Sequence, residues 1–368
     1  LFHKAIVQSG YSTSTSLKRA YDHGDSDSLI RRGSWRMVNE FLSTHTNETR
    51  VQDSLPLHEL NQILKDADAR DFIELYVNHD QDDSLPLTTA DGIVIPLEGL
   101  DEALANKKYA KNVPVIAGAT RDELTLWLGL HRYFIDESFP FTRVFPAVLK
   151  IRDPELYRLW VGIRSHAWKL RGVDQVLSNL ELAGNTDLYS YRFDWDDQEQ
   201  NYFVDFPALI GAAHATEIAF LTGVYKYGPI GKYIYPAGKL RDEMERIMMS
   251  TWGSFAHFSD PSMNLPISWP KFRDKQKNYL VLDKLEEIKI LKEEYDIDSL
   301  LNLIVASPSA SDLERCTIVW ESLINVGDPD LARYKQWNNG FCGRFDILEE
   351  QKRVSVELRK LYGSTTLM

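Results

Sequence analysis

Two segments of the sequence place an acid and a base where catalytic side chains commonly lie. Residues 113–118 have the apolar pattern of a buried strand and lead into Glu123, and a loop of small and apolar residues, 206–213, ends at His214. A rigid strand positions such a side chain, and the loop that follows exposes it. Taken singly, Glu123 is one of 54 acidic residues and His214 is one of nine histidines, so a solvated carboxylate and a structural imidazole are the simpler interpretations.

The chain order of these residues favours a joint role. An acid followed by a histidine is what an α/β-hydrolase shows after its nucleophilic serine. A G-x-S-x-G turn, which holds such a serine, does not occur; the serines that follow a glycine closely but lack the pattern are Ser12, Ser34, Ser254 and Ser364. The chain therefore offers an acid and a base without an attacking group.

Composition excludes several classes of protein. The 368 residues carry 42 Lys+Arg against 54 Asp+Glu, and a net charge of −12 argues against a nucleic-acid partner. Hydrophobic residues make up 43%, enough for a large core, but no run reaches the roughly 18 apolar residues of a membrane span. No metal-ligand motif or phosphate-binding loop occurs, so no cofactor is expected. Cys316 and Cys342 are equally compatible with one disulfide and with two free thiols.

The spacing of apolar residues predicts alternating helices and strands. Strands are expected at residues 3–10, 113–118, 188–195 and 279–282, and helices over most of 25–80 and at 99–106 and 240–255. The charged segment that starts at Asp283 is expected to open a helical tail that continues to the C-terminus. This alternation predicts an α/β protein with a mostly parallel sheet and packed helices.

Several motifs, in one order, closely resemble the type B carboxylesterase and cholinesterase-like family. The opening Leu-Phe-His-Lys-Ala-Ile-Val-Gln-Ser-Gly is similar to the segment that follows the family's nucleophile turn and helix. Further matching segments are Asp91-Gly92, residues 113–118, Asp122-Glu123, residues 189–193, residues 214–218 and residues 252–270. The resemblance covers roughly residues 1–282 and is loose beyond them.

The resemblance implies an α/β-hydrolase fold of which this chain is the C-terminal part. Residues 1–282 would belong to the C-terminal part of a carboxylesterase domain, and residues 283–368 would form a helical region that packs on or extends it. The nucleophilic serine and the oxyanion donors would then lie in an N-terminal part that precedes Leu1. Because a sheet cut before its nucleophile strand exposes an apolar edge, the segment by itself is expected to be inactive and to associate.

Carried over residue by residue, the resemblance assigns roles to four polar side chains. Glu123 would be the triad acid and His214 the general base. Ser9 matches a family serine near the acid, so it is interpreted either as a hydrogen-bond donor to Glu123 or as an ordinary strand-end serine. Glu217 resembles a carboxylate that follows the histidine and is interpreted as structural.

Four apolar positions near the acid and the base also follow from the resemblance. Leu126 and Trp127 fall where the family places the wall of the acyl or alcohol pocket, although Trp127 is almost as well explained as a core residue. Leu124 and Ala215 stand where the family usually has glycine, and Leu124 is expected to add bulk beside the triad.

The sequence thus predicts a serine carboxylesterase that acts on a small-molecule carboxylic ester without a cofactor. Two alternatives stay open. One is a cholinesterase-like binding or adhesion protein without a working nucleophile, and the other is an incomplete gene product that does not fold stably without the rest of the domain.

Overall fold

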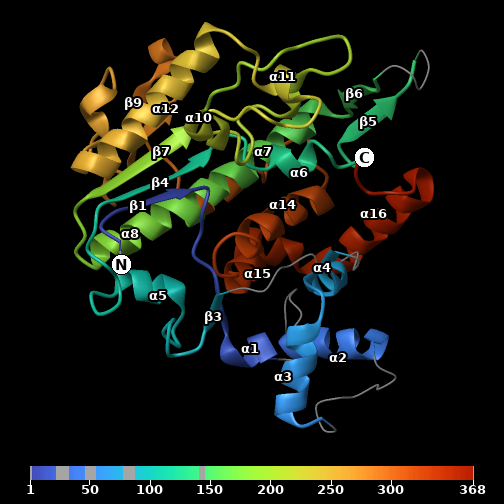
Figure 1. Ribbon diagram of the computed structural model, residues 1–368. Coiled ribbons are helices and arrows are strands. Elements are labelled where there is room, and N and C mark those ends of the chain that lie inside the picture. The colour runs from blue at the N-terminus through green and yellow to red at the C-terminus, as the bar shows by residue number, and fades with distance from the viewer. Residues whose placement is uncertain (1, 22–32, 46–54, 78–87, 141–145, 368) are drawn as a thin grey trace. The chain divides into compact units, whose positions relative to one another are not determined.

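The computed structural model describes residues 2–21, 33–45, 55–77, 88–140 and 146–367 (Figure 1). The chain forms two compact units. Unit 1 comprises Leu1–Ser12 and Leu104–Met368, and unit 2 comprises Thr13–Ala103. The predicted division of the chain at residue 282 stays a prediction.

Unit 1 is built on a five-stranded sheet with the order β1-β4-β7-β8-β9. The strands are β1 (Ala5–Gln8), β4 (Val115–Thr120), β7 (Leu188–Phe193), β8 (Asn278–Leu282) and β9 (Lys289–Lys292). The first four strands are parallel and β9 is antiparallel to β8. The four strands expected from the sequence therefore all form, and the sheet is mostly parallel, as predicted.

A glycine in β4 makes room for an aromatic ring of β7 at the centre of this sheet. All six residues of β4 are buried, as its run of small and aliphatic side chains predicts. Gly118 lies against the ring of Tyr191, and a Cβ at that position would come within 2.2 Å of the ring carbons. A larger residue at position 118 would therefore displace the Tyr191 ring.

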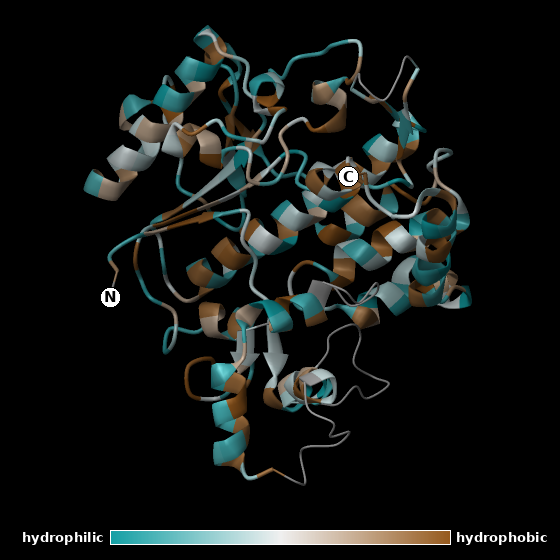
Figure 2. Cartoon of the chain, turned by 45° about the vertical axis from the view of Figure 1, so that its right-hand side comes forward, coloured by the Kyte–Doolittle hydropathy of each residue, from teal (hydrophilic) through white to brown (hydrophobic). Residues whose placement is uncertain are grey.

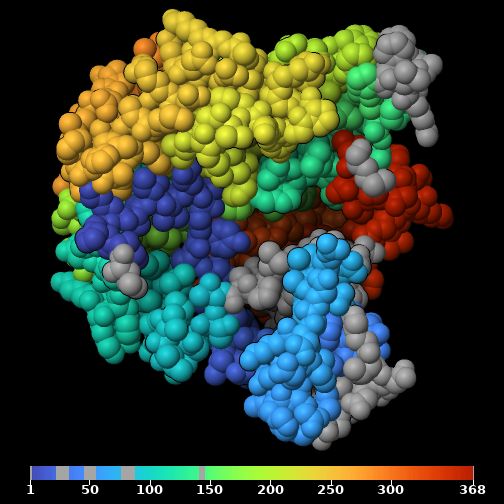
Figure 3. All heavy atoms as spheres, viewed as in Figure 1, coloured from blue at the N-terminus to red at the C-terminus, as the bar shows by residue number. Residues whose placement is uncertain are grey.

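Helices cover both faces of the sheet (Figure 1). One face is covered by α7 (Pro154–Trp168), the π-helical segment η1 (Lys169–Asp174) and α8 (Gln175–Leu182), and the other by α12 (Lys239–Phe258). The predicted helix at residues 240–255 is α12, whose Trp252 packs on Tyr191 with ring centroids 5.2 Å apart. In Figure 3, α12 and its neighbours form a continuous surface on this side of unit 1.

The remaining elements of unit 1 are short or lie toward the C-terminus. Between the main strands lie α6 (Thr125–Leu128), β5 (Ile135–Ser138), β6 (Val148–Ile151), α9 (Phe206–Leu209), α10 (Ile218–Thr222), α11 (Gly231–Ile234) and η2 (Pro261–Asn264). After β8 come η3 (Leu285–Glu287), α13 (Ile297–Asn302), α14 (Asp312–Ile324), α15 (Leu331–Gly340), η4 (Phe341–Arg344) and α16 (Ile347–Tyr362). Within the described residues, no helix combines the length and apolarity that crossing a membrane requires.

The predicted helical tail is wrong at its beginning. Residues after Asp283 first form η3 and the strand β9, and only from α13 onward is the tail helical. Leu280 of β8 pairs with Ile290 of β9, so the backbone groups along the outer side of β8 form hydrogen bonds with β9. The charged residues favoured a helix locally, but a free strand edge offers hydrogen bonds that a local pattern does not reveal.

Unit 2 is mostly helical, as predicted for residues 25–80. It contains α1 (Leu17–Tyr21), α2 (Ser34–His45), α3 (Leu57–Asp66), α4 (Ala69–Val77), a parallel pair, β2 (Ser14–Ser16) and β3 (Thr88–Ala90), and the first part of α5 (Leu100–Ala105), which continues into unit 1. Its small core holds Phe41, Leu42 and Leu60, and Phe72 stacks on Phe41 at 4.7 Å. Figure 2 shows hydrophobic and hydrophilic turns alternating along α3. Residues 22–32, 46–54 and 78–87, part of the predicted helical region, lie outside the described residues.

A disulfide joins Cys316 of α14 to Cys342 of η4, which settles the question that the sequence left open. Both cysteines are completely buried, and their Cα atoms are 5.4 Å apart. The bridge closes a loop with a sequence separation of 26 residues, which includes all of α15.

Removal of this bridge is expected to destabilise the C-terminal helices. Replacement of both cysteines by alanine should lower the free energy of unfolding by about 3 kcal/mol, because the open loop regains conformational freedom in the unfolded chain. Denaturant midpoints of the two proteins measure the change, and the wild type under strong reductant should approach the variant. Equal midpoints for the wild type and the variant would contradict the expectation.

Candidate active site

Glu123 is a completely buried carboxylate at the point where β4 ends. Its Oε1 accepts hydrogen bonds from the backbone N–H of Thr120 at 2.6 Å and from the hydroxyl of Ser9 at 2.5 Å. Its Oε2 lies 2.6 Å from Nδ1 of His214. A buried carboxylate is costly unless it is paired, and here both oxygens have partners.

His214 faces this carboxylate with one nitrogen and leaves the other uncommitted. A carboxylate only accepts hydrogen bonds, so Nδ1 carries the proton and donates to Glu123. The neutral ring then presents the lone pair of Nε2, which has no hydrogen-bond partner among the described residues. The side chain as a whole is 27% exposed.

Two opposing effects set the basicity of His214. Burial lowers the pKa of the imidazole, whereas the hydrogen bond and the charge of Glu123 raise it. The second effect prevails, and the pKa lies above the ordinary 6.5. Glu123 therefore both fixes the tautomer of His214 and stabilises its protonated form.

Asp122 fastens the loop of His214 to the loop of Glu123, a role that the sequence did not indicate. Its backbone N–H donates to the carbonyl of Ala212 at 3.0 Å, and its Oδ2 accepts from the N–H of the same residue at 3.0 Å. Gly211 has a φ of +52°, and a Cβ there would approach Asp122 Oδ2 to 2.4 Å. Burial raises the pKa of Asp122, and the neighbouring Arg121 guanidinium opposes that rise.

Ser9 follows β1 directly and holds the carboxylate from the neighbouring strand. Its backbone N–H donates to the carbonyl of Gly118 at 2.8 Å, and its hydroxyl donates to Glu123. Its φ of +51° places it in the left-handed region, which is uncommon for a residue with a side chain. Of the two interpretations left by the sequence, the hydrogen bond to Glu123 is the one present.

Glu217 lies behind His214 in an almost fully buried position. Its Oε1 accepts from the side-chain amide of Gln8 at 3.1 Å, and its Oε2 has no hydrogen-bond partner among the described residues. Burial, followed by the charge of Glu123, raises its pKa to about 7. At neutral pH the Glu217 side chain is therefore partly protonated.

Aromatic rings surround the imidazole on its open side. Trp127 is 46% exposed, and its ring centroid lies 5.2 Å from that of His214. Trp168, at the end of α7, lies 5.3 Å from His214 and 6.0 Å from Trp127, and Tyr11 meets it edge-on at 5.4 Å. The sequence pointed to Trp127 and to the half-buried Leu126. It missed Trp168 and Tyr11, because nothing in their local pattern separates them from core residues.

The two positions at which glycine was expected differ in consequence. Leu124 is buried, and its backbone N–H donates to Ser165 Oγ at 3.3 Å in an ordinary right-handed conformation that needs no glycine. Ala215 has a φ of +66°, where a Cβ is unfavourable. The described residues contain no group of three or more His, Cys, Asp or Glu side chains that could hold a metal ion.

Comparison with known proteins relates part of the chain to one family. Residues 166–297, which include His214, match the carboxylesterase family. A search of curated proteins finds no match.

One solved esterase structure shares the fold of this chain over most of its length. A PNB esterase structure is 18% identical with a TM-score of 0.51, and the match covers 80% of this chain and 55% of that one. The carboxylesterase EST55 of Geobacillus stearothermophilus is 20% identical with a TM-score of 0.49, covering 80% of this chain and 57% of its own. The first likeness supports an α/β fold of the esterase type. The chain spans a little over half the length of these proteins.

Substitution of Glu123 by glutamine is expected to lower the pKa of His214. The variant loses the charge of Glu123 that raises the pKa, whereas burial, which lowers it, remains, so the pKa should fall even though the charge of Glu217 still raises it. NMR titration of the histidine ring measures the change, and Glu286→Gln, which alters an exposed acid, is the matched control. An unchanged His214 pKa in the Glu123 variant would show that the two side chains do not interact.

Substitution of Ala215 by glycine is expected to stabilise the protein. Relief of the left-handed strain contributes about 1–2 kcal/mol, and the greater freedom of glycine in the unfolded chain offsets about 0.4–1 kcal/mol. The free energy of unfolding should therefore rise by roughly 0.5–1 kcal/mol. Ala213→Gly, at a buried position without positive φ, should lower it instead. An equal fall in the free energy of unfolding in both variants would contradict the strain argument.

Proposed function

We propose that this chain, whose residues 166–297 match the carboxylesterase family, forms part of a carboxylic ester hydrolase that uses a serine nucleophile. The observation that carries the proposal is the 2.6 Å hydrogen bond between Glu123 Oε2 and Nδ1 of the partly exposed His214 ring. An acid, a base and a free ring nitrogen in this order are what serine hydrolysis requires of the part that follows the nucleophile.

In the proposed reaction, His214 moves the proton and Glu123 keeps the ring in place. As the oxygen of a serine attacks the ester carbonyl carbon, Nε2 takes the proton of that serine hydroxyl. The Glu123 carboxylate stabilises the resulting imidazolium. Nε2 then gives that proton to the leaving alkoxide, and an acyl-serine remains. In the second half, Nε2 takes a proton from water as it attacks the acyl carbon, and returns it to the serine.

The serine and the donors that stabilise the oxyanion would come from sequence that precedes Leu1 in the complete enzyme. Ser9 would hold the acid through its hydrogen bond to Glu123, and Glu217 would be a structural carboxylate near the base. Leu126 and Trp127 would border the acyl or alcohol group of the ester. The substrate class is a small carboxylic ester, and the exposed part of Trp127 offers it an apolar contact.

Replacement of His214 by alanine should lower kcat of the complete enzyme by about four orders of magnitude or more, because no other group takes the serine proton. Hydrolysis of a p-nitrophenyl ester measures the loss. His257→Ala, on the exposed side of α12, is the matched control and should keep normal activity. Near-normal activity of the His214 variant would remove this residue from the mechanism.

The identity of the nucleophile needs its own experiment. The transcript upstream of Leu1 should contain an in-frame G-x-S-x-G, and a fluorophosphonate probe should label that serine in the complete protein. An intact upstream region with another residue at the serine position would replace the esterase proposal by a non-catalytic binding function.

A further inference from the structure

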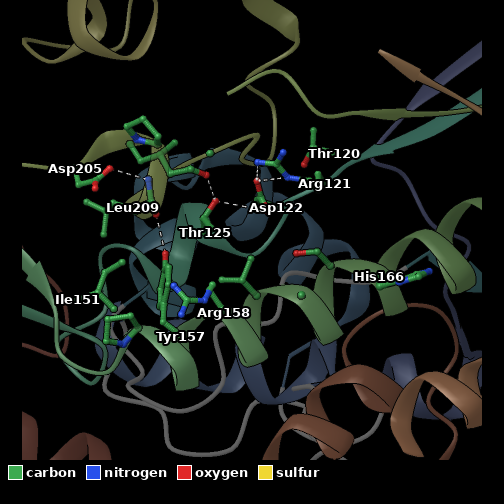
Figure 4. A pocket seen from close by; sticks show the side chains of 18 of the residues that line it. Thr120, Arg121, Asp122, Thr125, Ile151, Tyr157, Arg158, His166, Asp205 and Leu209 are labelled. Atoms are coloured by element: carbon green, nitrogen blue, oxygen red, sulfur yellow. Dashed lines mark hydrogen bonds and ion pairs between the residues drawn. The ribbon is translucent and has the colours of Figure 1, made fainter. Parts of the chain in front are cut away.

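A cavity of about 830 Å³ lies within unit 1, between α7 and the segment that leads to His214 (Figure 4). Neither Glu123 nor His214 lines it. In Figure 4 the side chain of Tyr157 extends from α7 across to the segment of Leu209, whose carbonyl accepts its hydroxyl at 2.7 Å. The volume falls in the range of roughly 300–1,000 Å³ that is usual for small-molecule sites.

The charged side chains in the lining are mostly committed to other groups. Three of the five cationic residues are held by carboxylates of the protein: Arg121, Lys169 and Arg192. The two acidic residues of the lining are also engaged, since Asp122 binds Arg121 and Asp205 accepts the N–H of Ala208 at the start of α9. These groups build the wall and leave little charge for a ligand.

Two further cations of the lining, Lys150 and Arg158, are exposed. The side chain of Lys150 in β6 has no hydrogen bond or ion pair among the described residues. Arg158 has only an exposed pair with Glu155, one turn away on the same helix. Exposed pairs of this kind contribute about 0–1 kcal/mol, so Arg158 can exchange Glu155 for a ligand at little cost. The lining therefore includes two cations, Lys150 and Arg158, that no buried carboxylate holds.

Helix α7 lines one side of the cavity, here called its floor, and contains a glycine that no close contact requires. Gly162 lies inside α7, where glycine costs about 0.5–1 kcal/mol relative to alanine. No heavy atom lies within 4 Å of the position its Cβ would take, and its φ is not positive. The missing side chain leaves room in the lining of the cavity, which also contains the apolar side chains of Ile151, Val161 and Leu209.

We infer that this cavity binds an organic carboxylate with an apolar body. The carboxylate is held by Lys150 and Arg158, of which the guanidinium can donate two parallel hydrogen bonds to it. The apolar body lies over Gly162 and along the aliphatic side chains. The inference does not rest on the proposed esterase activity, because none of these residues takes part in the proposed reaction.

Calorimetric titration of the protein with decanoate tests the inference. Decanoate should bind, whereas decyltrimethylammonium, which reverses the charge, and acetate, which lacks the apolar body, should bind at least tenfold more weakly, a difference of about 1.4 kcal/mol or more. The double variant Lys150→Glu/Arg158→Glu should lose at least tenfold in decanoate affinity. Lys352→Glu/Lys360→Glu makes the same change of charge on the exposed side of α16 and should bind normally.

A second pair of variants tests the apolar part independently of charge. Gly162→Leu fills the floor and should lower decanoate affinity at least tenfold, whereas Gly162→Ala should change it little. Both should melt no lower than the wild type, because each replaces a helical glycine. Unchanged affinity in both the charge-reversed and the Gly162→Leu variants, or equal binding of the cationic detergent, would overturn the inference. Such a result would leave the effect of His214→Ala on ester hydrolysis untouched.

Discussion

The buried carboxylate of Glu123 is the constraint around which unit 1 is arranged. A charge without exposure is tolerated only if the protein supplies partners, and an unpaired one would cost several kcal/mol. Its three partners come from separate parts of the chain: the end of β1, the end of β4 and the loop that ends at His214. They meet because β1, β4 and β7 are parallel neighbours whose carboxyl ends share one edge of the sheet. The Glu123 carboxylate therefore has its three partners only when β1, β4 and β7 pair in this order.

The electrostatics of the pocket follow from what surrounds that carboxylate. Glu123 raises the pKa of His214, and its charge also contributes to the raised pKa of Glu217. Because burial and the charge of Glu123 raise the pKa of Glu217 to about 7, Glu217 is only partly charged at neutral pH. Its contribution to the raised pKa of His214 is reduced accordingly.

Two further hydrogen bonds hold the loop that leads to His214, and the side chains that form them also line the cavity. Asp122 binds the loop through Ala212, and Thr125 Oγ1 donates to the carbonyl of Ile210 at 2.6 Å. The segments that flank Glu123 and precede His214 therefore also contribute residues to the wall of the cavity, among them Asp122, Thr125 and Ile210. The two spaces share a partition but use different side chains, so a ligand in one does not need the chemistry of the other.

The amino-acid sequence by itself determined the local elements and the order of the reactive groups. Buried-strand patterns and amphipathic spacing were enough for β4, β7, β8 and α12, and the order of Glu123 and His214 indicated an acid and a base. Tertiary structure alone decided the antiparallel pairing of β9, the Cys316–Cys342 bridge, the contact of Trp168 with His214 and the role of Asp122. The reason is physical: helix and strand periodicity is written within a few turns of chain, whereas hydrogen bonds at a sheet edge and contacts between distant rings depend on which surfaces the rest of the fold leaves free.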